Sequence, residues 1–408
     1  MTLFPSPDDP DATQPRPQTS RRARTGWTML VVALVLGLVM SFLPAPYVIE
    51  QPGPVYDTLG SQEQDGEQVP LISIDGVETY PTAGTLDMLT VSVRGTREQR
   101  PSWAEIVSAW FDSSKAVVPI DLIYPPTVTT EQRNQQNAAL MVDSQTEAIA
   151  AALSEQDIAF TREVTVAAVT DDGAAAGVLE AGDAILSVNG TAVDDIDELR
   201  AALAENGTET PATLVVRSGD PADDGTADDS TQGDDTDDTT EGDDSADTQP
   251  APERTVELTP RTSPDSADPV LGISVTYGYE FPFDVQIQLN DVGGPSAGMM
   301  FALGIIDKLT PGELNGGESV AGTGTIDDAG TVGAIGGIRQ KLFGARDAGA
   351  DWFLAPASNC DEVVGHVPDG IQVVAVATLD EALTAVETIG DGGDTGSLTT
   401  CDAVMAQQ

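Results

Sequence analysis

The chain has 408 residues, enough for two or three domains, and a formal net charge of −49. This acidity argues against nucleic acid as a partner, because phosphate binding needs a basic surface. Part of the excess is local, since fourteen Asp or Glu and no Lys or Arg lie between Arg217 and Arg254. We interpret the acidic residues as a solvated surface, which would also repel an acidic substrate.

The N-terminal part predicts a polar tail followed by a membrane helix. Residues 1–20 are rich in Pro, Asp, Ser and Thr and lack apolar periodicity, so we expect them to be disordered. Residues 26–43 contain no charge, and 18 such residues are the lower limit for a membrane-spanning helix. A cleaved signal peptide is the rival interpretation, but the long polar leader and the poor cleavage site around Pro44 count against it.

The distribution of arginines predicts the orientation of this helix. Three arginines, at 21, 22 and 24, precede the apolar segment, and no Lys or Arg follows until Arg94. The positive-inside rule then places residues 1–25 in the cytoplasm and everything after Pro44 outside. The sequence therefore predicts a single-pass protein of the cell membrane, with most of the chain extracytoplasmic.

Residues 44–153 mix short apolar runs with turns. Residues 86–93 are predicted to form a strand. Residues 103–111 predict an amphipathic helix, with Trp103, Ile106, Val107 and Trp110 on one side. A second helix is predicted over 144–153, beginning with a capping box made by Ser144 and Glu147.

Residues 163–217 predict a compact β-rich unit. Its expected elements are strands at 164–169, 184–188 and 213–217, a helical turn at 174–179 and a helix at 196–204. Within it, residues 177–190 read GVLEAGDAILSVNG, where a Gly-Asp turn and an Asn-Gly turn frame an apolar strand.

This segment closely resembles the core of bacterial PDZ domains, whose usual wording is G-L-x-x-G-D-x-I-x-x-(V/I)-(N/D)-G. Any β-rich module with two turns is the alternative interpretation. The resemblance implies peptide binding by strand addition. We expect the groove between the strand Val164–Val169 and the helix 196–204.

Residues 218–252 are a low-complexity run of Asp, Thr, Gly and Ser that cannot bury a core, so we expect disorder. The run lies between 213–217 and 255–258, which predict the two strands of a hairpin. It is therefore expected to be a long insertion at a hairpin tip, where added loop length costs little. A calcium-binding tract is the alternative, but the Asp pairs lack EF-hand spacing, and no metal site is predicted.

Residues 269–389 predict an α/β segment. Strands are expected at 272–276 and 285–289, followed by a helix from about Pro295 to Leu309. After strand-like turns near 320–325 and 331–332, the remaining expected elements are helix 338–348, strands 352–355 and 373–375, and helix 379–389.

Ser296 and Lys341 are the candidate catalytic pair. Ser296 lies on a glycine-rich turn, and Lys341 lies near the start of a predicted helix. The chain has only three lysines and one histidine. A serine hydroxyl needs a base to become a nucleophile, and a lysine can act as one when burial keeps it neutral. The positive end of the helix dipole would also disfavour the lysine cation. The ordinary alternatives are a helix start with small residues and a solvated surface lysine.

The residues around the serine have expected roles. Free N–H groups at the start of the Ser296 helix are expected to hold an oxyanion, and the glycines to admit a substrate backbone. The residues assigned to these oxyanion and substrate-backbone contacts are Gly293, Gly294, Pro295 and Ala297. His366, in a turn-like stretch, is the other base to consider, but no Gly-x-Ser-x-Gly elbow surrounds Ser296.

These motifs resemble the proteolytic domain of Lon proteases, which carries Pro-Ser-Ala-Gly, then Thr-Gly, then Ile-Gly-Gly-x-x-x-Lys. The resemblance, strong over 285–356, implies a Ser296–Lys341 dyad with Thr323 orienting the lysine. Thr325 departs from the family, where Glu is usual. The order of anchor, PDZ unit and Lon-like domain is similar to the PDZ-containing Lon-like serine proteases of actinobacteria and related Gram-positive bacteria.

The resemblance also shapes the expected activity. No Gly-x-x-x-x-Gly-Lys-Ser/Thr motif occurs, so we expect an ATP-independent endopeptidase that needs no cofactor and acts on proteins or peptides. A hexameric ring is expected by analogy only. The alternative function is a non-catalytic PDZ scaffold on a degenerate peptidase fold.

The two cysteines and the domain map complete the expectations. Cys360 and Cys401 would form a disulfide in an oxidising compartment, two unrelated thiols being the alternative. The predicted fold is an α/β and α+β multidomain protein, with the PDZ domain inserted into or preceding the Lon-like domain. The expected map is a tail at 1–25, a membrane helix at 26–43, an N-terminal part of the Lon-like domain at 44–153, a PDZ domain at 154–262, the Lon-like catalytic domain at 263–392 and a tail at 393–408.

Overall fold

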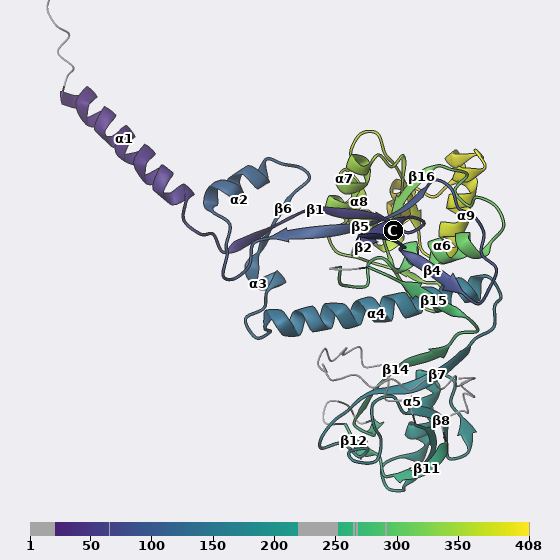
Figure 1. Ribbon diagram of the computed structural model, residues 1–408. Coiled ribbons are helices and arrows are strands. Elements are labelled where there is room, and N and C mark those ends of the chain that lie inside the picture. Colours follow the sequence, from purple (N-terminus) through teal and green to yellow (C-terminus); the bar gives the residue numbers. More distant parts are fainter. Residues whose placement is uncertain are drawn as a thin grey trace, which may run out of the picture. The chain divides into compact units, whose positions relative to one another are not determined.

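The computed structural model describes residues 21–64, 66–218, 252–263, 266, 268–289 and 292–407 (Figure 1). The predictions for residues 1–20 and for 219–251 of the acidic insertion lie outside these described residues. The chain divides into two compact units. The first unit comprises Met1–Ser73, Thr79–Ala148 and Ile287–Gln408, and the second comprises Ile74–Glu78 and Ile149–Gln286.

The first helix, α1, covers Arg21–Ser41 and contains most of the uncharged segment 26–43. Its apolar side chains are exposed, with Trp27 at 71% and Leu34 at 65%. A search of the described residues finds no helix that meets the length and apolarity needed to cross a membrane.

A six-stranded mixed sheet forms the centre of the first unit. Its order is β20-β19-β16-β5-β1-β6. The four strands from β20 to β5 are parallel, and β1 pairs antiparallel with both β5 and β6. The bounds of these strands are β1 Tyr47–Asp57, β5 Thr85–Arg94, β6 Ala116–Pro119, β16 Ser319–Gly322, β19 Trp352–Pro356 and β20 Gln372–Val376.

Helices pack on both faces of this sheet because successive strand residues point to opposite sides. In β19, Phe353 belongs to the apolar cluster formed with Leu342 and Ala345 of α7. The next residue, Leu354, points to the other face of the sheet and lies beside Gly322. Met300 of α6 covers Gly322 on that same face. The helices of this unit that continue the α/β pattern are α6 Gly298–Leu309, α7 Ile338–Ala348 and α9 Leu379–Gly390.

Short elements complete the first unit. The remaining helices are α2 Trp103–Trp110, α3 Ile120–Ile123, α8 Cys360–Val363 and α10 Cys401–Met405, with 3-10 turns η1 Ala357–Asn359 and η2 Thr395–Ser397. The remaining strands are β2 Ser61–Gln64, β3 Glu67–Pro70, β17 Thr325–Ile326 and β18 Val332–Gly333. Strands β4 Ile72–Asp75 and β15 Asp284–Ile287 pair with each other and include the residues at which the chain passes from one unit to the other.

The predicted C-terminal tail is part of the core. Residues after 393 form η2 and α10, and a disulfide joins Cys401 of α10 to Cys360 of α8. Both cysteines are buried in the α7 cluster, and Val404 and Met405 pack against it. The segment predicted as a C-terminal tail at 393–408 therefore packs against the first unit and buries apolar side chains there.

The helix predicted at 144–153 is much longer than expected. It is α4, which covers Thr130–Glu155. The capping box of Ser144 and Glu147 is absent, because both residues lie inside the helix rather than at its start. Ser144 instead donates its hydroxyl hydrogen bond to the carbonyl oxygen of Pro295 at 3.0 Å. The Ser-x-x-Glu pattern, which usually marks the start of a helix, here lies inside one, and its serine makes a buried contact with a distant residue.

The second unit contains the predicted β-rich module. Its sheet has the order β11-β10-β8-β7-β14, with β9 beside β8, and the helix α5 begins after the cap Asp195. Apolar side chains from the sheet and from α5 form one core. The bounds are β7 Thr161–Val169, β8 Ala184–Val188, β9 Thr191–Ala192, α5 Ile196–Asn206, β10 Ala212–Arg217, β11 Glu253–Leu258, β12 Arg261–Thr262, β13 Pro269–Val270 and β14 Ile273–Glu280.

The two turns that framed the sequence motif have clear physical roles. Asp183 is almost fully buried, accepts a hydrogen bond from the backbone N–H of Glu180 and forms an ion pair with Arg254. Asn189 adopts a φ of 52°, and its side-chain oxygen accepts a hydrogen bond from the backbone N–H of Thr213. The hairpin of β10 and β11 also forms, with Arg217 opposite Glu253.

Two predictions about this unit need correction. The strand predicted at 272–276 is β14, which pairs with β7 of the second unit, so the unit ends at Gln286 rather than at residue 262. Residues Val164–Val166 of β7 bond to the β8 segment on one side and to β14 on the other. A peptide therefore cannot add to β7 there. Among the described strands, β11 and β14 are the outer strands of this sheet, and the Tyr277 hydroxyl of β14 lies 3.4 Å from the backbone N–H of Ile196 at the start of α5.

Candidate active site

Ser296 lies in a loop at the carboxyl end of β16, just before α6. Gly294 in this loop has a φ of 92°, a conformation that glycine adopts without strain. Ala297 is the cap residue and α6 begins at Gly298, so the helix predicted from Pro295 starts three residues later. Ser296 is partly buried, and its carbonyl oxygen accepts a hydrogen bond from the backbone N–H of Gly324 at 3.0 Å.

Lys341 reaches Ser296 from the second turn of α7. Its Nζ lies 2.8 Å from Oγ of Ser296 and 2.7 Å from Oγ1 of Thr323. The side chain is almost completely withdrawn from solvent, with 2% of the residue exposed. The structure therefore brings together the three residues for which the sequence predicted a nucleophile, a base and an orienting hydroxyl.

Thr323 connects the other two residues. It follows β16, is fully buried, and its backbone N–H donates to the carbonyl oxygen of Leu354 in β19 at 3.2 Å. Its hydroxyl donates to the carbonyl oxygen of Ser296 at 2.8 Å while receiving the hydrogen bond from Lys341. Because the threonine proton is committed to that carbonyl, one Lys341 hydrogen points to Thr323 and the nitrogen lone pair can face Ser296.

Burial lowers the pKa of the Lys341 ammonium to about 7. Loss of solvation disfavours the charged form, and no carboxylate of the residues that the structure describes offsets it. The sequence analysis also expected the positive end of the helix dipole to disfavour the lysine cation. In the structure, burial is the cause of the lowered pKa. A substantial fraction of Lys341 is therefore neutral near pH 7 and able to accept a proton.

The long helix α4 supports the nucleophile loop. The hydroxyl of Ser144, which is 1% exposed, donates to the carbonyl oxygen of Pro295, and the backbone N–H of Gly294 donates to the carbonyl oxygen of Asn137 at 3.0 Å. The sequence analysis missed this role of Ser144, because nothing in the local pattern indicates a partner 151 residues away. The Thr129-x-x-Gln132 capping pattern, whose two reciprocal hydrogen bonds form in the structure, is the signal that could have placed the helix start before Ser144.

The glycines near Ser296 have different structural reasons. A Cβ on Gly293 would lie 2.8 Å from Cβ of Asn137, and a Cβ on Gly298 would lie 2.9 Å from Oγ of Ser144. These two glycines let the loop lie against α4, and Gly293 also lines the groove beside Ser296, so its predicted contact with a substrate backbone stays a prediction. At Gly294 a Cβ would meet nothing within 4 Å, so the left-handed backbone alone requires glycine there.

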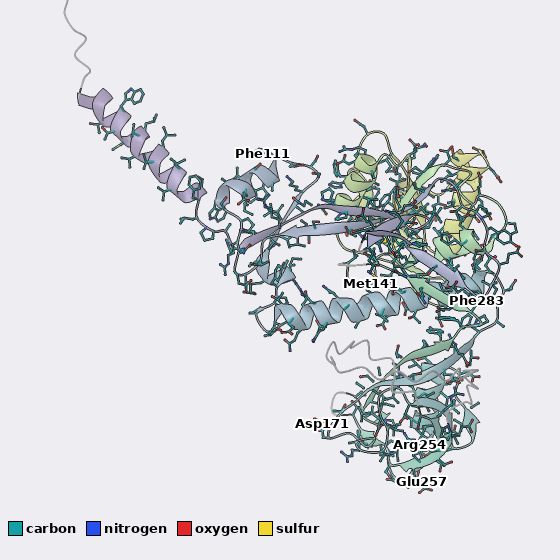
Figure 2. The ribbon with its side chains drawn as sticks, viewed as in Figure 1. Phe111, Met141, Asp171, Arg254, Glu257 and Phe283 are labelled. Atoms are coloured by element: carbon teal, nitrogen blue, oxygen red, sulfur yellow. A yellow bond between two sulfur atoms is a disulfide. The ribbon has the colours of Figure 1, made fainter. Side chains whose placement is uncertain are left out.

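A groove of about 420 Å³ opens beside the Ser296 hydroxyl. Its apolar walls include Met88 and Val91 of β5 and Met141 of α4, which is labelled in Figure 2. A second hollow of about 740 Å³ shares Met141, Val292 and Gly293 with it and continues along α4. Together they are large enough for several residues of an extended chain rather than a single small molecule.

Backbone donors lie at the floor of this groove. The N–H groups of Ser296 and Ala297 have no hydrogen-bond partner among the residues that the structure describes. They precede α6, where the first helical N–H groups also lack partners within the helix. Pro295 is one of the four neighbours predicted to contact an oxyanion or a substrate backbone. It has no N–H and can only accept a hydrogen bond, and its carbonyl oxygen already accepts one from Ser144.

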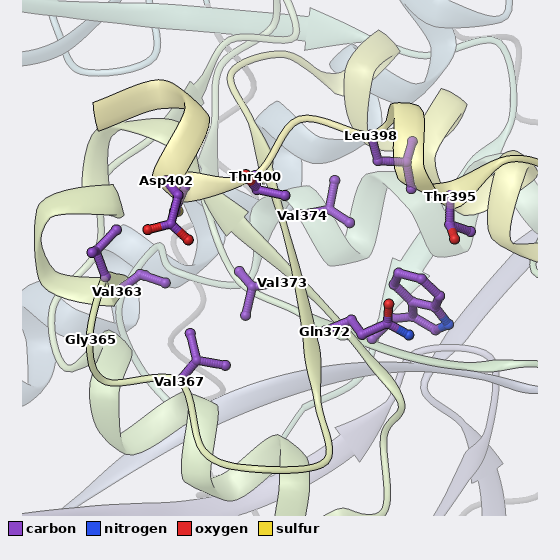
Figure 3. A pocket seen from close by; sticks show the side chains of 13 residues that line it. Val363, Gly365, Val367, Gln372, Val373, Val374, Thr395, Leu398, Thr400 and Asp402 are labelled. Atoms are coloured by element: carbon purple, nitrogen blue, oxygen red, sulfur yellow. The ribbon is translucent and has the colours of Figure 1, made fainter. Parts of the chain in front are cut away.

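The other candidates lie elsewhere. His366 is exposed in the loop after α8, and it does not line the groove. The disulfide partner Cys401 lines a separate hollow of about 510 Å³ at β20 (Figure 3), whose one titratable lining residue is Asp402. No group of three or more His, Cys, Asp or Glu that could hold a metal ion occurs in the described ranges.

Comparisons with known proteins identify both units. Residues 290–388 match the C-terminal proteolytic domain of Lon protease (S16), and residues 165–218 match a PDZ domain. The chain combines a Lon-type proteolytic domain with a PDZ domain. This combination fits a PDZ-containing Lon-like protease, and both domains are mixed or β-rich folds as the sequence predicted.

Similar proteins cover only part of the chain. It is 40% identical over 107 residues to Lon protease 2 of Herpetosiphon aurantiacus and 34% identical over 123 residues to Lon protease 2 of Bacillus subtilis. These matches cover 24% and 29% of this chain and 13% and 22% of those relatives. The chain therefore spans less than a quarter of the length of either relative.

The PDZ domain of the SdrC-like protein from Listeria monocytogenes is a similar solved structure. It has 18% sequence identity and a TM-score of 0.19, covering 28% of this chain and 87% of that one.

Proposed function

We propose that this chain is a serine endopeptidase in which Ser296 is the nucleophile and Lys341 the general base. The observation that carries the proposal is the buried Lys341 amine within hydrogen-bond distance of both hydroxyls. Serine nucleophiles require an adjacent base, and the burial of this lysine supplies a neutral one near pH 7. The match to the Lon-type proteolytic domain supports peptide bonds as the target.

The first chemical step forms an ester. Lys341 Nζ takes the hydroxyl proton as Ser296 Oγ attacks the carbonyl carbon of the substrate, and the carbonyl oxygen becomes an oxyanion. The N–H groups of Ser296 and Ala297 can donate to this oxyanion, which is the usual largest electrostatic contribution to such reactions. The Lys341 ammonium then gives its proton to the departing amine as the C–N bond breaks, leaving an acyl ester on Ser296.

The second step hydrolyses that ester. The neutral Lys341 amine removes a proton from water, whose oxygen attacks the ester carbonyl. When the C–O bond to Ser296 breaks, Lys341 returns the proton to Oγ and the acid product leaves. Thr323 holds the amine in place through both steps, because its hydroxyl stays donated to the Ser296 carbonyl oxygen and its own oxygen accepts from Lys341.

The apolar walls of the groove favour substrates with apolar side chains next to the cleaved bond. Unfolded polypeptides expose such side chains, whereas folded proteins bury most of them. The acidic surface of the chain would repel acidic segments, since the net charge is −49. We therefore propose that the substrates are unfolded or locally extended protein segments.

The proposal also covers location and energy source. The uncharged segment 26–43, preceded by three arginines, supports a single-pass membrane anchor with residues 1–25 in the cytoplasm and the catalytic domain outside. The exposed apolar side chains of α1 and the Cys360–Cys401 disulfide are consistent with that placement. The 408 residues contain no Walker A motif, which supports cleavage without ATP.

The PDZ domain is proposed to bind extended peptide segments of substrates. A peptide would add as a strand to the outer edge of β14, next to α5, where the backbone N–H of Ile196 lies 3.4 Å from the Tyr277 hydroxyl. This replaces the groove predicted at Val164–Val169, because Val164–Val166 already bond to a neighbouring strand or segment on both sides.

The test is cleavage of an unfolded protein by the purified full chain in detergent, without ATP. We expect S296A to abolish cleavage and labelling by a serine-directed covalent probe. The exposed Ser397 provides a matched control, and S397A should retain both. Cleavage by S296A at the wild-type rate would refute the nucleophile, and failure of the probe to label wild-type protein would favour a non-catalytic scaffold.

A further inference from the structure

Helix α2 of the first unit exposes an apolar face. Val107 is 44% exposed, Trp110 59% and Phe111, which caps the helix, 89%. These three positions have i, i+3 and i+4 spacing, so they share one side of the helix. The sequence analysis placed Val107 and Trp110 on one side of the helix together with Trp103 and Ile106, and in the structure Ile106 is buried while Val107 and Trp110 are exposed.

The core of this region uses the other side of α2. Ile106 and Ala109 pack with Ala45 and Ile49, while Trp103 and Tyr47 form an edge-to-face ring pair with centroids 5.9 Å apart. The helix is therefore apolar on two sides and lies on the surface of the protein. A helix that is apolar nearly all round is normally enclosed by protein or lipid, so the second face needs a partner.

Hydrogen bonds connect the start of α2 to the end of the apolar N-terminal segment. The backbone N–H of Trp103 donates to the carbonyl oxygen of Leu43 at 3.1 Å, and the N–H of Ala45 donates to Pro101 at 2.8 Å. Pro44 and Ser102 form a further β-bridge. Leu43 ends the proposed membrane segment, so α2 starts at the membrane surface if that segment spans the bilayer.

Dimensions and charge fit a bilayer surface. An eight-residue helix is about 12 Å long, so Phe111 stays within about one helix length of the membrane boundary. Between Arg94 and Lys115 there are four Lys or Arg and three Asp or Glu, in a chain of net charge −49. This segment is therefore not repelled by anionic headgroups as the rest of the chain is.

We propose that Val107, Trp110 and Phe111 form a lipid-facing surface that inserts into the outer leaflet beside the membrane anchor. The proposal rests on the anchor included in the proposed function. Aromatic side chains suit the headgroup boundary because their rings tolerate both apolar and polar surroundings. With two attachments, the helix and this surface, the first unit would be held at a fixed height over the membrane.

The experiment uses the full chain in vesicles of phosphatidylcholine and phosphatidylglycerol. The described cysteines are both in the disulfide, so F111C adds a specific site for an environment-sensitive fluorophore. D380C, on the exposed side of α9, is the matched control, and L34C, within α1, reports the anchor itself. Lipids that carry a quencher on the acyl chain are compared with a water-soluble quencher.

We expect lipid quenching at positions 111 and 34, at least about twofold stronger than at 380, and weak quenching from water at 111. Quenching at 34 but not at 111 would overturn the inference and leave the anchor intact. No lipid quenching at 34 or 111 would overturn both. Protection of 111 from the water-soluble quencher without lipid quenching would assign the surface to a second copy or a protein partner, which also overturns the inference.

Discussion

Lys308 and Lys341 are both withdrawn from water in the first unit, yet they lie in opposite electrostatic settings. Lys308, at the end of α6, has its pKa lowered by burial, but Asp307 and Asp57 act in the opposite direction. Lys341, in α7, has its pKa lowered to about 7 by burial alone, and its partners are hydroxyls. The same burial therefore acts differently on the two lysines, because nearby carboxylates oppose the fall in the pKa of Lys308.

The same comparison explains the chemistry near Lys308. Asp307 is buried, and the pKa of its carboxyl is raised chiefly by burial, as is that of Asp57. A charged Lys308 partly compensates these two groups. This region is a structural charge cluster, whereas the Lys341 region is a low-dielectric site for proton transfer.

The largest expected effect is the fall in kcat when Lys341 is replaced by arginine, and the same replacement of Lys308 is the comparison. Arginine stays charged at all ordinary pH values, so K341R should lower kcat by about 1,000-fold or more, as K341A should. K308R keeps the charge that its carboxylates need and should change kcat little. The measurement is steady-state cleavage of a fluorogenic peptide, and retained activity in K341R would break the comparison.

The next largest effect is on stability. The folded pKa of Lys341, about 7, lies below its unfolded value, so the unfolded chain holds the extra proton between these values. The contribution of Lys341 to the free energy of unfolding is thus lowest below pH 7 and increases as the pH rises toward 10. K341M should stabilise the fold by about 4 kcal/mol at pH 7, with a gain that shrinks at higher pH.

Denaturant titrations at several pH values measure this gain. K308M is the matched variant, and its gain should be smaller than that of K341M, because Asp307 and Asp57 offset part of the effect of burial on the pKa of Lys308. A K341M protein that is less stable than wild type at pH 7 would contradict a neutral, desolvated lysine.

A smaller effect is expected from pH alone. Activity should rise with pH through an apparent pKa of about 7, because only the neutral amine accepts the serine proton. At pH 6 kcat/KM should be about tenfold below its plateau. Burial and nearby carboxylates also raise the pKa of Glu147 to about 7, so E147Q must be compared, and it should keep the same profile. A profile that disappears in E147Q would assign the titration to α4.

The smallest expected effect concerns the support of Ser296 by α4. S144A removes the hydrogen bond to Pro295 and should cost about 1 kcal/mol of stability, with a fall in kcat of about tenfold. KM should change less than kcat, because the loop that positions the nucleophile is affected rather than the walls of the groove. S144T can restore the bond and should recover activity, while S154A, at an exposed position of the same helix, is the control.

Much of the secondary structure was predictable because local patterns decided it. The 338–348 helix and the 184–188 strand were predicted with the bounds that the structure has, since glycines and periodic apolar residues mark their ends. Errors arose where tertiary contacts overrode local signals. Ser144 resembled a cap but faces Pro295, and the strand at 273–280 pairs with β7 rather than with the catalytic sheet.

The sequence by itself determined which residues can do the chemistry. A rare lysine and a serine on a glycine-rich turn indicated the dyad, and the resemblance to Lon proteolytic domains implied Thr323 as the orienting hydroxyl. Only the tertiary structure decided that Lys341 is buried without a carboxylate, that α4 holds the nucleophile loop, and that α2 exposes an apolar face. The physical reason is that desolvation and packing depend on residues far apart in the chain, which local spacing does not encode.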